Sequence, residues 1–147
     1  MDIAHLVATR ATCPRRSVGA VLVKDRRILA TGYNGAPRKM AHCPIDGGKN
    51  DWPLGCLKAG HCIRALHAEQ NVLLQAAKIG ISCEGADLYV TCQPCNMCAK
   101  MIVNAGVAKV IYEGDYPDEF ALEIFTESGI SLQRYVQPNP DSPRGSP

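Results

Sequence analysis

The sequence of 147 residues contains no apolar run that approaches the length of a membrane span, and its net charge is small. A formal charge of +2 gives no reason to expect a protein that coats nucleic acid or a membrane surface, although a small anionic substrate is compatible with it. The start, residues 1–5, lacks the basic and apolar regions of a signal peptide, so we expect a cytoplasmic protein. With 46% hydrophobic and 20% charged residues, the composition is that of one ordinary globular domain.

Eight cysteines are many for a cytoplasmic chain. In a secreted domain they would indicate disulfides, but here no export signal precedes them and several lie near histidines. Metal binding, at one site or more, is therefore the better account, and a disulfide scaffold is the alternative.

Hydrophobic periodicity and helix stop signals predict an α/β domain over residues 1–136. The expected helices cover residues 3–10, 66–79, 94–104 and 118–128, and the expected strands cover 18–24, 27–31, 86–91, 107–112 and 130–136. Pro94 is expected to open the third helix, where its missing N–H costs nothing. A hairpin followed by three helix–strand units predicts helices over a five-stranded sheet, with parallel neighbours in its second half.

Residues 36–62 form a proline- and glycine-rich insertion that also contains cysteines and histidines. We expect no regular structure in it, and a loop of this length is either functional or held by something other than backbone hydrogen bonds. The last segment, residues 137–147, contains four prolines and is expected to be disordered.

One imidazole, two thiols and one carboxylate come from two short segments, His67-Ala68-Glu69 and Cys95-Asn96-Met97-Cys98. These are the parts of a three-ligand zinc site with an open position and a proton shuttle beside it. A structural zinc takes four protein ligands and needs no neighbouring acid. The pattern therefore favours an enzyme with zinc on His67, Cys95 and Cys98 and with Glu69 as its catalytic acid and base.

The spacing of His67 and Glu69 sets a geometric condition, because residues two apart inside a helix point to nearly opposite sides. They can serve one site only if the helix end itself faces the metal. Cys92 offers an alternative, since Cys92 and Cys95 also form a CxxC pair. A purely structural zinc on Cys92, Cys95, Cys98 and His67 remains possible on the sequence, but it leaves Glu69 without a role.

The pair HAE and PCxxC resembles the zinc-dependent nucleoside and nucleotide deaminases, and the surrounding residues narrow the resemblance to the deoxycytidylate deaminase family. The stretches that carry it are CPRRSVGAV at 13–21, GYNGAP at 32–37 and HCIRALHAEQN at 61–71. The resemblance implies a cytidine-deaminase-like three-layer fold, in which a five-stranded mixed sheet has helices on both faces. It also implies hydrolytic deamination of dCMP to dUMP and ammonia, which feeds thymidylate synthesis.

Four residues outside the zinc pattern are candidates for substrate binding. Related deaminases place an asparagine at the position of Asn34, where it grips a base or sugar edge; the alternative is a turn asparagine that binds its own backbone. Arg15 or Arg16 is expected to bind the 5′-phosphate, unless both are solvated surface residues. Tyr116 is expected to stack on the pyrimidine or to serve ordinary packing.

The resemblance also implies features beyond the catalytic centre. Some family members respond to dCTP and dTTP, which makes Tyr33 and Gly35 candidates for effector contact, with Mg accompanying the nucleotide, and such members are commonly hexamers. Some hold a second, structural zinc, for which Cys13, Cys43, Cys56 and His61 are the candidate ligands, with Cys62 or His42 as possible replacements for one of them.

Three other functions stay open on the sequence. A tRNA adenosine deaminase would share the zinc pattern but should present a basic face to RNA, which the small net charge disfavours. A nucleoside or guanine deaminase differs mainly in lacking a phosphate-binding arginine. A zinc-ordered interaction module without catalysis would have no open coordination position.

Overall fold

The computed structural model describes residues 1–43, 56–58 and 61–137. Our expectation of a disordered tail falls almost entirely outside these ranges. The helices are α1 (Asp2–Ala8), α2 (Ala68–Lys78), α3 (Asn96–Asn104) and α4 (Glu119–Ser128), and the strands are β1 (Gly19–Lys24), β2 (Arg27–Tyr33), β3 (Leu57–Lys58), β4 (His61–Cys62), β5 (Asp87–Cys92), β6 (Lys109–Gly114) and β7 (Ser131–Arg134). In the described ranges no helix has the length and apolar character needed to cross a membrane.

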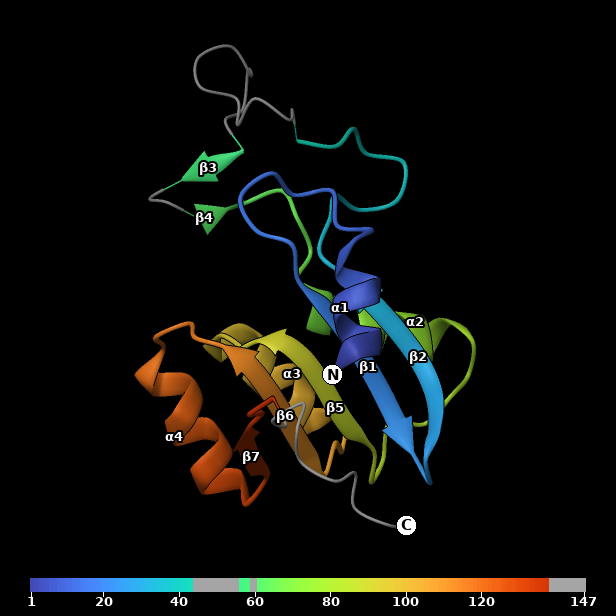
Figure 1. The fold of residues 1–147 in the computed structure, drawn as a ribbon, viewed down its shortest axis with the longest axis vertical. Coiled ribbons are helices and arrows are strands. Elements are labelled where there is room, and N and C mark those ends of the chain that lie inside the picture. Colours follow the sequence, from blue (N-terminus) through green and yellow to red (C-terminus); the bar gives the residue numbers. More distant parts are fainter. Residues whose placement is uncertain (44–55, 59–60, 138–147) are drawn as a thin grey trace.

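The main sheet has five strands in the order β2-β1-β5-β6-β7 (Figure 1). The strand pairs β1–β2 and β1–β5 are antiparallel, whereas β5–β6 and β6–β7 are parallel. The parallel pairs arise because α3 and α4 each run back along the sheet, so that the next strand begins at the same end as the strand before it. The prediction of a five-stranded mixed sheet with parallel neighbours in its second half is confirmed.

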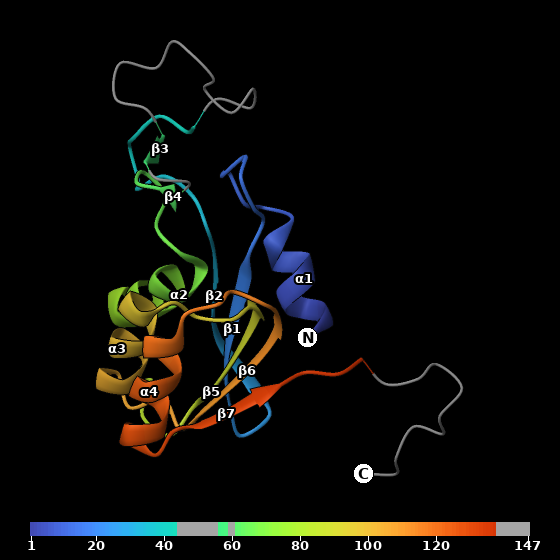
Figure 2. The same cartoon turned by 90° about the vertical axis from the view of Figure 1, so that its left-hand side faces the viewer.

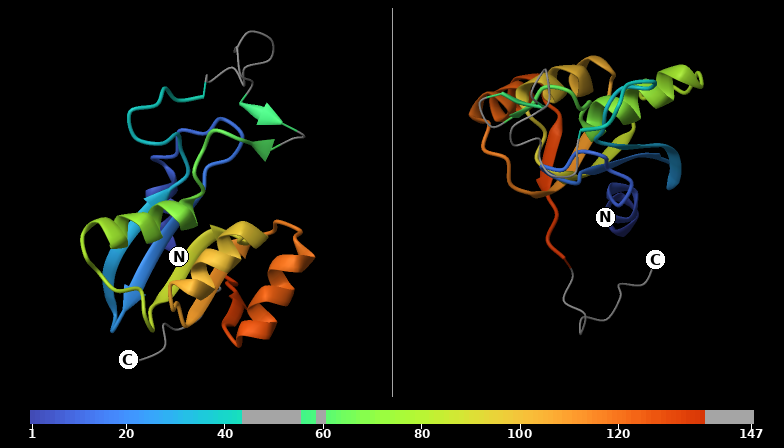
Figure 3. Two further views of the ribbon diagram at one scale, coloured as in Figure 1. Left: turned by 180° about the vertical axis from the view of Figure 1, so that it is seen from behind. Right: turned by 90° about the horizontal axis from the view of Figure 1, so that it is seen from above.

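Helices cover the two faces of this sheet unequally. In Figure 2, α2, α3 and α4 lie on one face and α1 lies alone on the other, and the views in Figure 3 agree. The three-layer arrangement with helices on both faces is confirmed. The core lies mainly between the sheet and the three-helix layer, where Leu22, Leu88, Val90, Ile102 and Phe125 are fully buried. Burial of this apolar surface is the main stabilising contribution to the fold.

Close contact between β2 and α2 depends on Gly32. A Cβ atom at this position would lie 2.4 Å from the carbonyl oxygen of Ala68 and 2.4 Å from the backbone nitrogen of Val72. Only a residue without a side chain lets the first turns of α2 approach the sheet this closely. This contact places the beginning of α2 beside the strands that carry the rest of the site.

Several boundaries differ from the sequence-based expectation, and three of these differences have a clear structural reason. The second helix begins at Ala68 rather than at residue 66, because Leu66 exchanges backbone hydrogen bonds with Gly35 instead. The third helix begins at Asn96, so Pro94 precedes the N-cap residue Cys95 and does not occupy the first helical turn. The strand expected to end at residue 31 continues to Tyr33, because its pairing with β1 extends to the register Gly19–Tyr33.

The insertion also differs from expectation. We expected no regular structure in residues 36–62, but β3 and β4 form a short antiparallel pair, with Leu57 opposite Cys62 and Lys58 opposite His61. This pair lies beyond the end of the main sheet (Figure 1). Two-residue strands carry no period-2 pattern that a sequence could reveal.

Candidate active site

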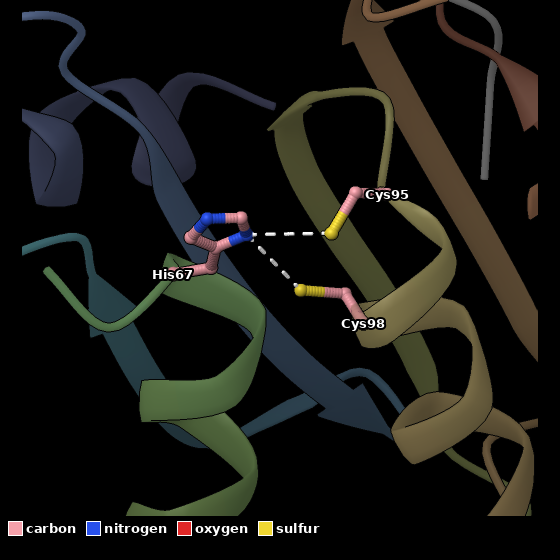
Figure 4. A group of neighbouring side chains, drawn as sticks. All are labelled: His67, Cys95 and Cys98. Atoms are coloured by element: carbon pink, nitrogen blue, oxygen red, sulfur yellow. Dashed lines mark hydrogen bonds between the residues drawn. The ribbon is translucent and has the colours of Figure 1, made fainter. Parts of the chain in front are cut away.

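His67, Cys95 and Cys98 meet where the N-terminal ends of α2 and α3 face each other (Figure 4). The Nδ1 atom of His67 lies 3.5 Å from Sγ of Cys95 and 3.3 Å from Sγ of Cys98. All three ligand atoms lie within 4.8 Å of one another, and no other group in the described residues does this. The metal-ligand pattern of the sequence is therefore brought together in space.

The spacing of these atoms fits zinc. In a tetrahedral zinc site with ordinary bond lengths, a ligand nitrogen and a ligand sulfur are about 3.6 Å apart. The two measured separations, 3.5 and 3.3 Å, are close to this value. One imidazole with two thiols is also a donor set that zinc prefers over magnesium or calcium. The residues present therefore fit a zinc ion with a position left for another ligand.

The conformation at the start of α2 satisfies the geometric condition on His67 and Glu69. His67 is the N-cap residue, with an extended backbone (φ −74°, ψ 157°), so its side chain does not follow helical spacing. Glu69 lies one residue inside the helix and is only 4% exposed. Its carboxyl group interacts electrostatically with His67 and Cys98. The helix end itself therefore faces the centre, and both side chains reach it.

Burial gives Glu69 an acid strength suited to proton transfer. Desolvation is the largest effect and raises the pKa of Glu69 to about 7, against smaller opposing effects from its own backbone N–H and from His67. A carboxyl group with a pKa in this range can both take and release a proton near neutral pH. Such a group beside a metal-ligand cluster is typical of a catalytic centre.

The surroundings of the ligand sulfurs favour a thiolate on one of them. Hydrogen bonding from Cys98 is the first of the effects that lower the pKa of Cys95 to about 4, and hydrogen bonding from His67 adds to it. The same bond to Cys95, together with burial, raises the pKa of Cys98. Cys95 is therefore the thiolate of the pair without a metal, and thiolate is the form that binds zinc.

Cys92 does not belong to the ligand group. Its Sγ atom accepts a hydrogen bond of 2.8 Å from Nη1 of Arg16, and it lies at the end of β5, before the turn that carries Cys95. Within the part of the chain that the structure describes, the metal-ligand group has three side chains. This arrangement disfavours the alternative of a four-ligand structural zinc that uses Cys92.

A pocket opens over the ligands, and every residue that the sequence analysis assigned to substrate lies in its lining. These residues are Arg15, Arg16, Asn34 and Tyr116, and Glu69 lines the same pocket. Arg16 also donates to the carbonyl oxygen of Asp115 over 3.4 Å, so its guanidinium is held by two contacts within the protein. Arg15 is exposed at this pocket.

The side chain of Asn34 binds the backbone of another segment and not that of its own turn. Its Oδ1 atom accepts from the backbone N–H of Val18 (2.8 Å), and its Nδ2 atom donates to the carbonyl oxygen of Arg16 (2.7 Å). These bonds fix the loop that carries both arginines. An amide has a second N–H and a second lone pair, so Asn34 retains one donor and one acceptor for a ligand.

The sequence profile described as "cytidine and deoxycytidylate deaminase zinc-binding region" matches residues 1–114. The chain belongs to the cytidine and deoxycytidylate deaminase family. This deaminase-family chain is 42% identical over 136 residues to ComE operon protein 2 of Bacillus subtilis, covering 91% of this chain and 68% of that protein. It is 42% identical over 120 residues to the deoxycytidylate deaminase of Mycobacterium phage D29, covering 76% and 89% of the two chains.

Other relatives differ in length or are known in three dimensions. The deoxycytidylate deaminase of Saccharomyces cerevisiae is 36% identical over 92% of this chain, which spans only 43% of the yeast protein. The crystal structure of dCMP deaminase from cyanophage S-TIM5, in complex with dCMP and dUMP, matches with a TM-score of 0.77 and 34% identity, and 91% of this chain and 92% of the phage chain are covered. The fold described above is therefore that of a deaminase.

This deaminase-family chain contains a second group of sulfur atoms, the cysteine cluster of Cys13, Cys43, Cys56 and Cys62. Sγ of Cys43 lies 3.7 Å from Sγ of Cys62, and the thiols of Cys62 and Cys13 and those of Cys43 and Cys56 are close enough to affect each other's pKa. Three of these cysteines were predicted ligands of a second zinc. The structure brings Cys62 close to two of them, Cys13 and Cys43, and the side chain of the fourth predicted ligand, His61, lies outside the described residues.

Backbone N–H groups point at two sulfurs of this cluster. Burial raises the pKa of Cys62, but N–H groups of Ala65 (3.4 Å) and Arg64 and the two thiol contacts outweigh burial and lower that pKa. The N–H groups of Arg15 and Arg16 point in the same way at Cys13, where burial still dominates and raises the pKa. Paired N–H···S contacts stabilise thiolate, which is the metal-binding form.

Sequence reasoning missed two residues whose side chains bind the backbone next to the zinc ligands. Gln70 Oε1 accepts from the backbone N–H of His67 over 2.8 Å, as in a capping box. Asp118 Oδ2 accepts from the backbone N–H of Asn96, the residue after Cys95, over 2.9 Å. The glutamine three residues after His67 was a readable signal, because a capping box has this spacing. The contact between Asp118 and Asn96 joins two separate elements and left no local signal.

Proposed function

We propose that this chain catalyses the zinc-dependent hydrolysis of dCMP to dUMP and ammonia. The observation that carries the proposal is the meeting of one imidazole and two thiols at two helix ends, with the buried carboxyl of Glu69 lining the same pocket. The phage relative crystallised with dCMP and dUMP supports the choice of nucleotide. We also propose a cytoplasmic location, as in a pathway that supplies thymidylate.

Zinc bound to His67, Cys95 and Cys98 would act as a Lewis acid that makes an adjacent water more acidic. Glu69 takes the proton that this water loses as its oxygen attacks C4 of the cytosine ring. The same carboxyl delivers this proton to ring N3, then takes the remaining proton of the attacking oxygen and passes it to the leaving amine. The C4–N bond breaks, the water oxygen becomes the new carbonyl oxygen, and ammonia leaves. A pKa of about 7 lets Glu69 perform both the uptake and the release.

Arg15 is the stronger candidate for contact with the 5′-phosphate. Nη1 of Arg16 donates to Sγ of Cys92 and to the carbonyl oxygen of Asp115, so part of its guanidinium is already bound within the protein. Arg15 lines the same pocket from an exposed position, and a guanidinium matches the phosphate oxygens in shape and charge. The remaining donor and acceptor of Asn34 would bind the sugar or base, and Tyr116, which lines the same pocket, would stack on the pyrimidine.

The substrate is tested by measuring ammonia release from dCMP, deoxycytidine and cytosine with the zinc-loaded chain. The proposal expects a much higher kcat/KM for dCMP, because only this substrate carries the phosphate. Equal rates on all three would contradict phosphate recognition, and activity on the two others alone would favour a nucleoside or nucleobase deaminase. The absence of ammonia from all three would leave the deaminase proposal without support.

We further propose that the cysteine cluster binds a second, structural zinc. The thiols lie in a chain of contacts, but no three of them in the described residues meet the 4.8 Å spacing of the catalytic group. A metal would therefore draw them closer and fasten the insertion to the loop of Cys13. Metal analysis of the purified chain should give a zinc-to-chain ratio of about two; a ratio near one would remove the second site.

Regulation by dCTP and dTTP, with Mg, is proposed for the segment of Tyr33 and Gly35. Gly35 donates to Leu66 over 3.1 Å and accepts from Leu66 over 2.8 Å, and Leu66 directly precedes His67. A nucleotide bound at this segment would therefore act on the backbone that presents a zinc ligand. We expect the regulated form to be a hexamer, as resemblance implies, and dTTP titration during the dCMP assay tests the effector response.

A further inference from the structure

The side chain of Cys95 is a weak cap for its own helix, because its sulfur is a member of the zinc-ligand group. N-cap residues usually use a side-chain oxygen to accept from the free N–H groups of the first turn. Cys95 is the N-cap residue of α3, but its side chain makes no cap hydrogen bond and its sulfur lies at the zinc-ligand group. An oxygen acceptor from elsewhere in the chain would therefore strengthen the turn that carries two ligands.

Asp118 supplies this acceptor from the neighbouring helix. Its Oδ2 atom accepts from the backbone N–H of Asn96 and from Nδ2 of the same residue, both over 2.9 Å. Its Oδ1 atom accepts from the backbone N–H of Ala121 over 3.1 Å, which caps α4. One carboxylate thus caps two helices, one oxygen for each.

The charge of Asp118 suits this position. Burial would raise the pKa of Asp118, but the hydrogen bonds from Asn96 and Ala121 and the nearby charge of Lys100 outweigh it and lower that pKa. The positive ends of two helix dipoles also favour a negative charge there. A neutral side chain would lose this attraction on both helices.

We propose that Asp118 is a positioning residue of the zinc site, which aims the Cys95 sulfur by fixing the first turn of α3. The bond to the N–H of Asn96 fixes the peptide that follows Cys95, whose backbone is extended with ψ at 169°. This torsion sets the direction of the Cys95 side chain relative to Cys98 and His67. The inference rests on the proposed zinc function, but it concerns metal retention and not substrate choice.

The variant Asp118→Ser separates the two tasks of the carboxylate. Serine is as good an N-cap as aspartate, so its hydroxyl can still accept from Ala121 and cap α4. It has a single, shorter-reaching oxygen and no charge, so it cannot also hold Asn96. The control is Gly129→Ala, which strains the other end of α4, where Gly129 has φ +72° and no atom lies within 4 Å of an added Cβ.

The experiment measures zinc transfer from the loaded full-length variants to a coloured chelator, without substrate. The phase of zinc release that belongs to the catalytic site is the one that is missing when the same measurement is made on His67→Ala. We expect Asp118→Ser to lose zinc about 10-fold faster than the parent chain, Asn96→Ala to lie between the two, and Gly129→Ala to stay within about twofold of the parent. The cobalt-loaded Asp118→Ser chain should also show a shifted thiolate-to-metal charge-transfer band.

Two outcomes would overturn the proposal. One is zinc loss and a cobalt spectrum of Asp118→Ser that match the parent chain, and the other is equal acceleration in Gly129→Ala, which would mean that α4 stability alone matters. If Asp118→Ser does not fold, Asn96→Ala decides, and a parent-like rate in that variant counts against the proposal. Failure of the parent chain to release ammonia from dCMP would remove the proposed function but leave the zinc measurement interpretable.

Discussion

Gly32→Ala should leave the chain folded but displace α2, the helix that carries His67 and Glu69 at its start. The new Cβ would lie 2.4 Å from two backbone atoms of α2, whereas ordinary contact begins at 3.4 Å. Backbone cannot rotate away as a side chain can, so α2 must move from β2 by about 1 Å (the difference between these two distances). His67 and Glu69 lie at the start of this helix and must move with it.

The expected cost follows from this displacement. Overpacking a well-packed core costs about 1–3 kcal/mol, and we expect the upper end here because both obstructing atoms are backbone. For a chain of this size, that loss lowers Tm by about 10 °C. A misplacement of about 1 Å in a catalytic group can lower kcat by about 100-fold. The variant should therefore fold at 20 °C but deaminate poorly.

The assay pairs thermal unfolding with dCMP turnover on zinc-loaded protein. Gly129→Ala is the matched control, because its cost of about 1 kcal/mol comes from left-handed backbone strain far from α2. It should lower Tm by a few degrees and leave kcat within about twofold of the parent. A Gly32→Ala chain with the Tm and kcat of the parent would refute the packing argument. A loss of kcat in Gly129→Ala as large as in Gly32→Ala would show that lowered stability alone explains the loss.

Three further predictions concern the pocket and the second metal. Arg15→Ala should raise KM for dCMP at least about 10-fold and leave deoxycytidine turnover unchanged, because only the phosphate contact is lost, and equal effects on both substrates would contradict the assignment. Arg16→Ala should have the smaller phosphate effect and instead disturb the loop that Asn34 holds. Cys62→Ser should lower the zinc-to-chain ratio from about two to about one while zinc stays at His67, and an unchanged ratio would exclude Cys62 as a ligand.

Much of the fold could be predicted because its elements carry local signals. Four helices and the five strands of the main sheet have clear periodicity or stop residues, and the order of helix–strand units determined the parallel pairs. The strands β3 and β4 could not be predicted, since two residues contain no periodicity. The start of α2 was placed too early because Leu66 favours helix by propensity, whereas pairing with Gly35 holds it extended.

The ligand residues could be predicted because zinc chemistry restricts both residue type and spacing. The role of Asp118 could not, because its contact with Asn96 spans 22 residues and depends on how α3 and α4 pack. Asn34 was ambiguous for a similar reason. Its amide holds the backbone of residues 16 and 18, a contact across 16 to 18 positions that leaves no local signal, and it still has one donor and one acceptor for a ligand.

The central claim is that Glu69 moves the protons of a hydrolytic deamination beside zinc. It is tested most directly by ammonia release from dCMP with zinc-loaded Glu69→Gln, measured beside the parent chain. The amide keeps the size of the side chain but cannot take a proton from water, so we expect zinc to stay bound and turnover to fall by at least about 100-fold. Parent-like turnover in a variant that retains its zinc would contradict the account.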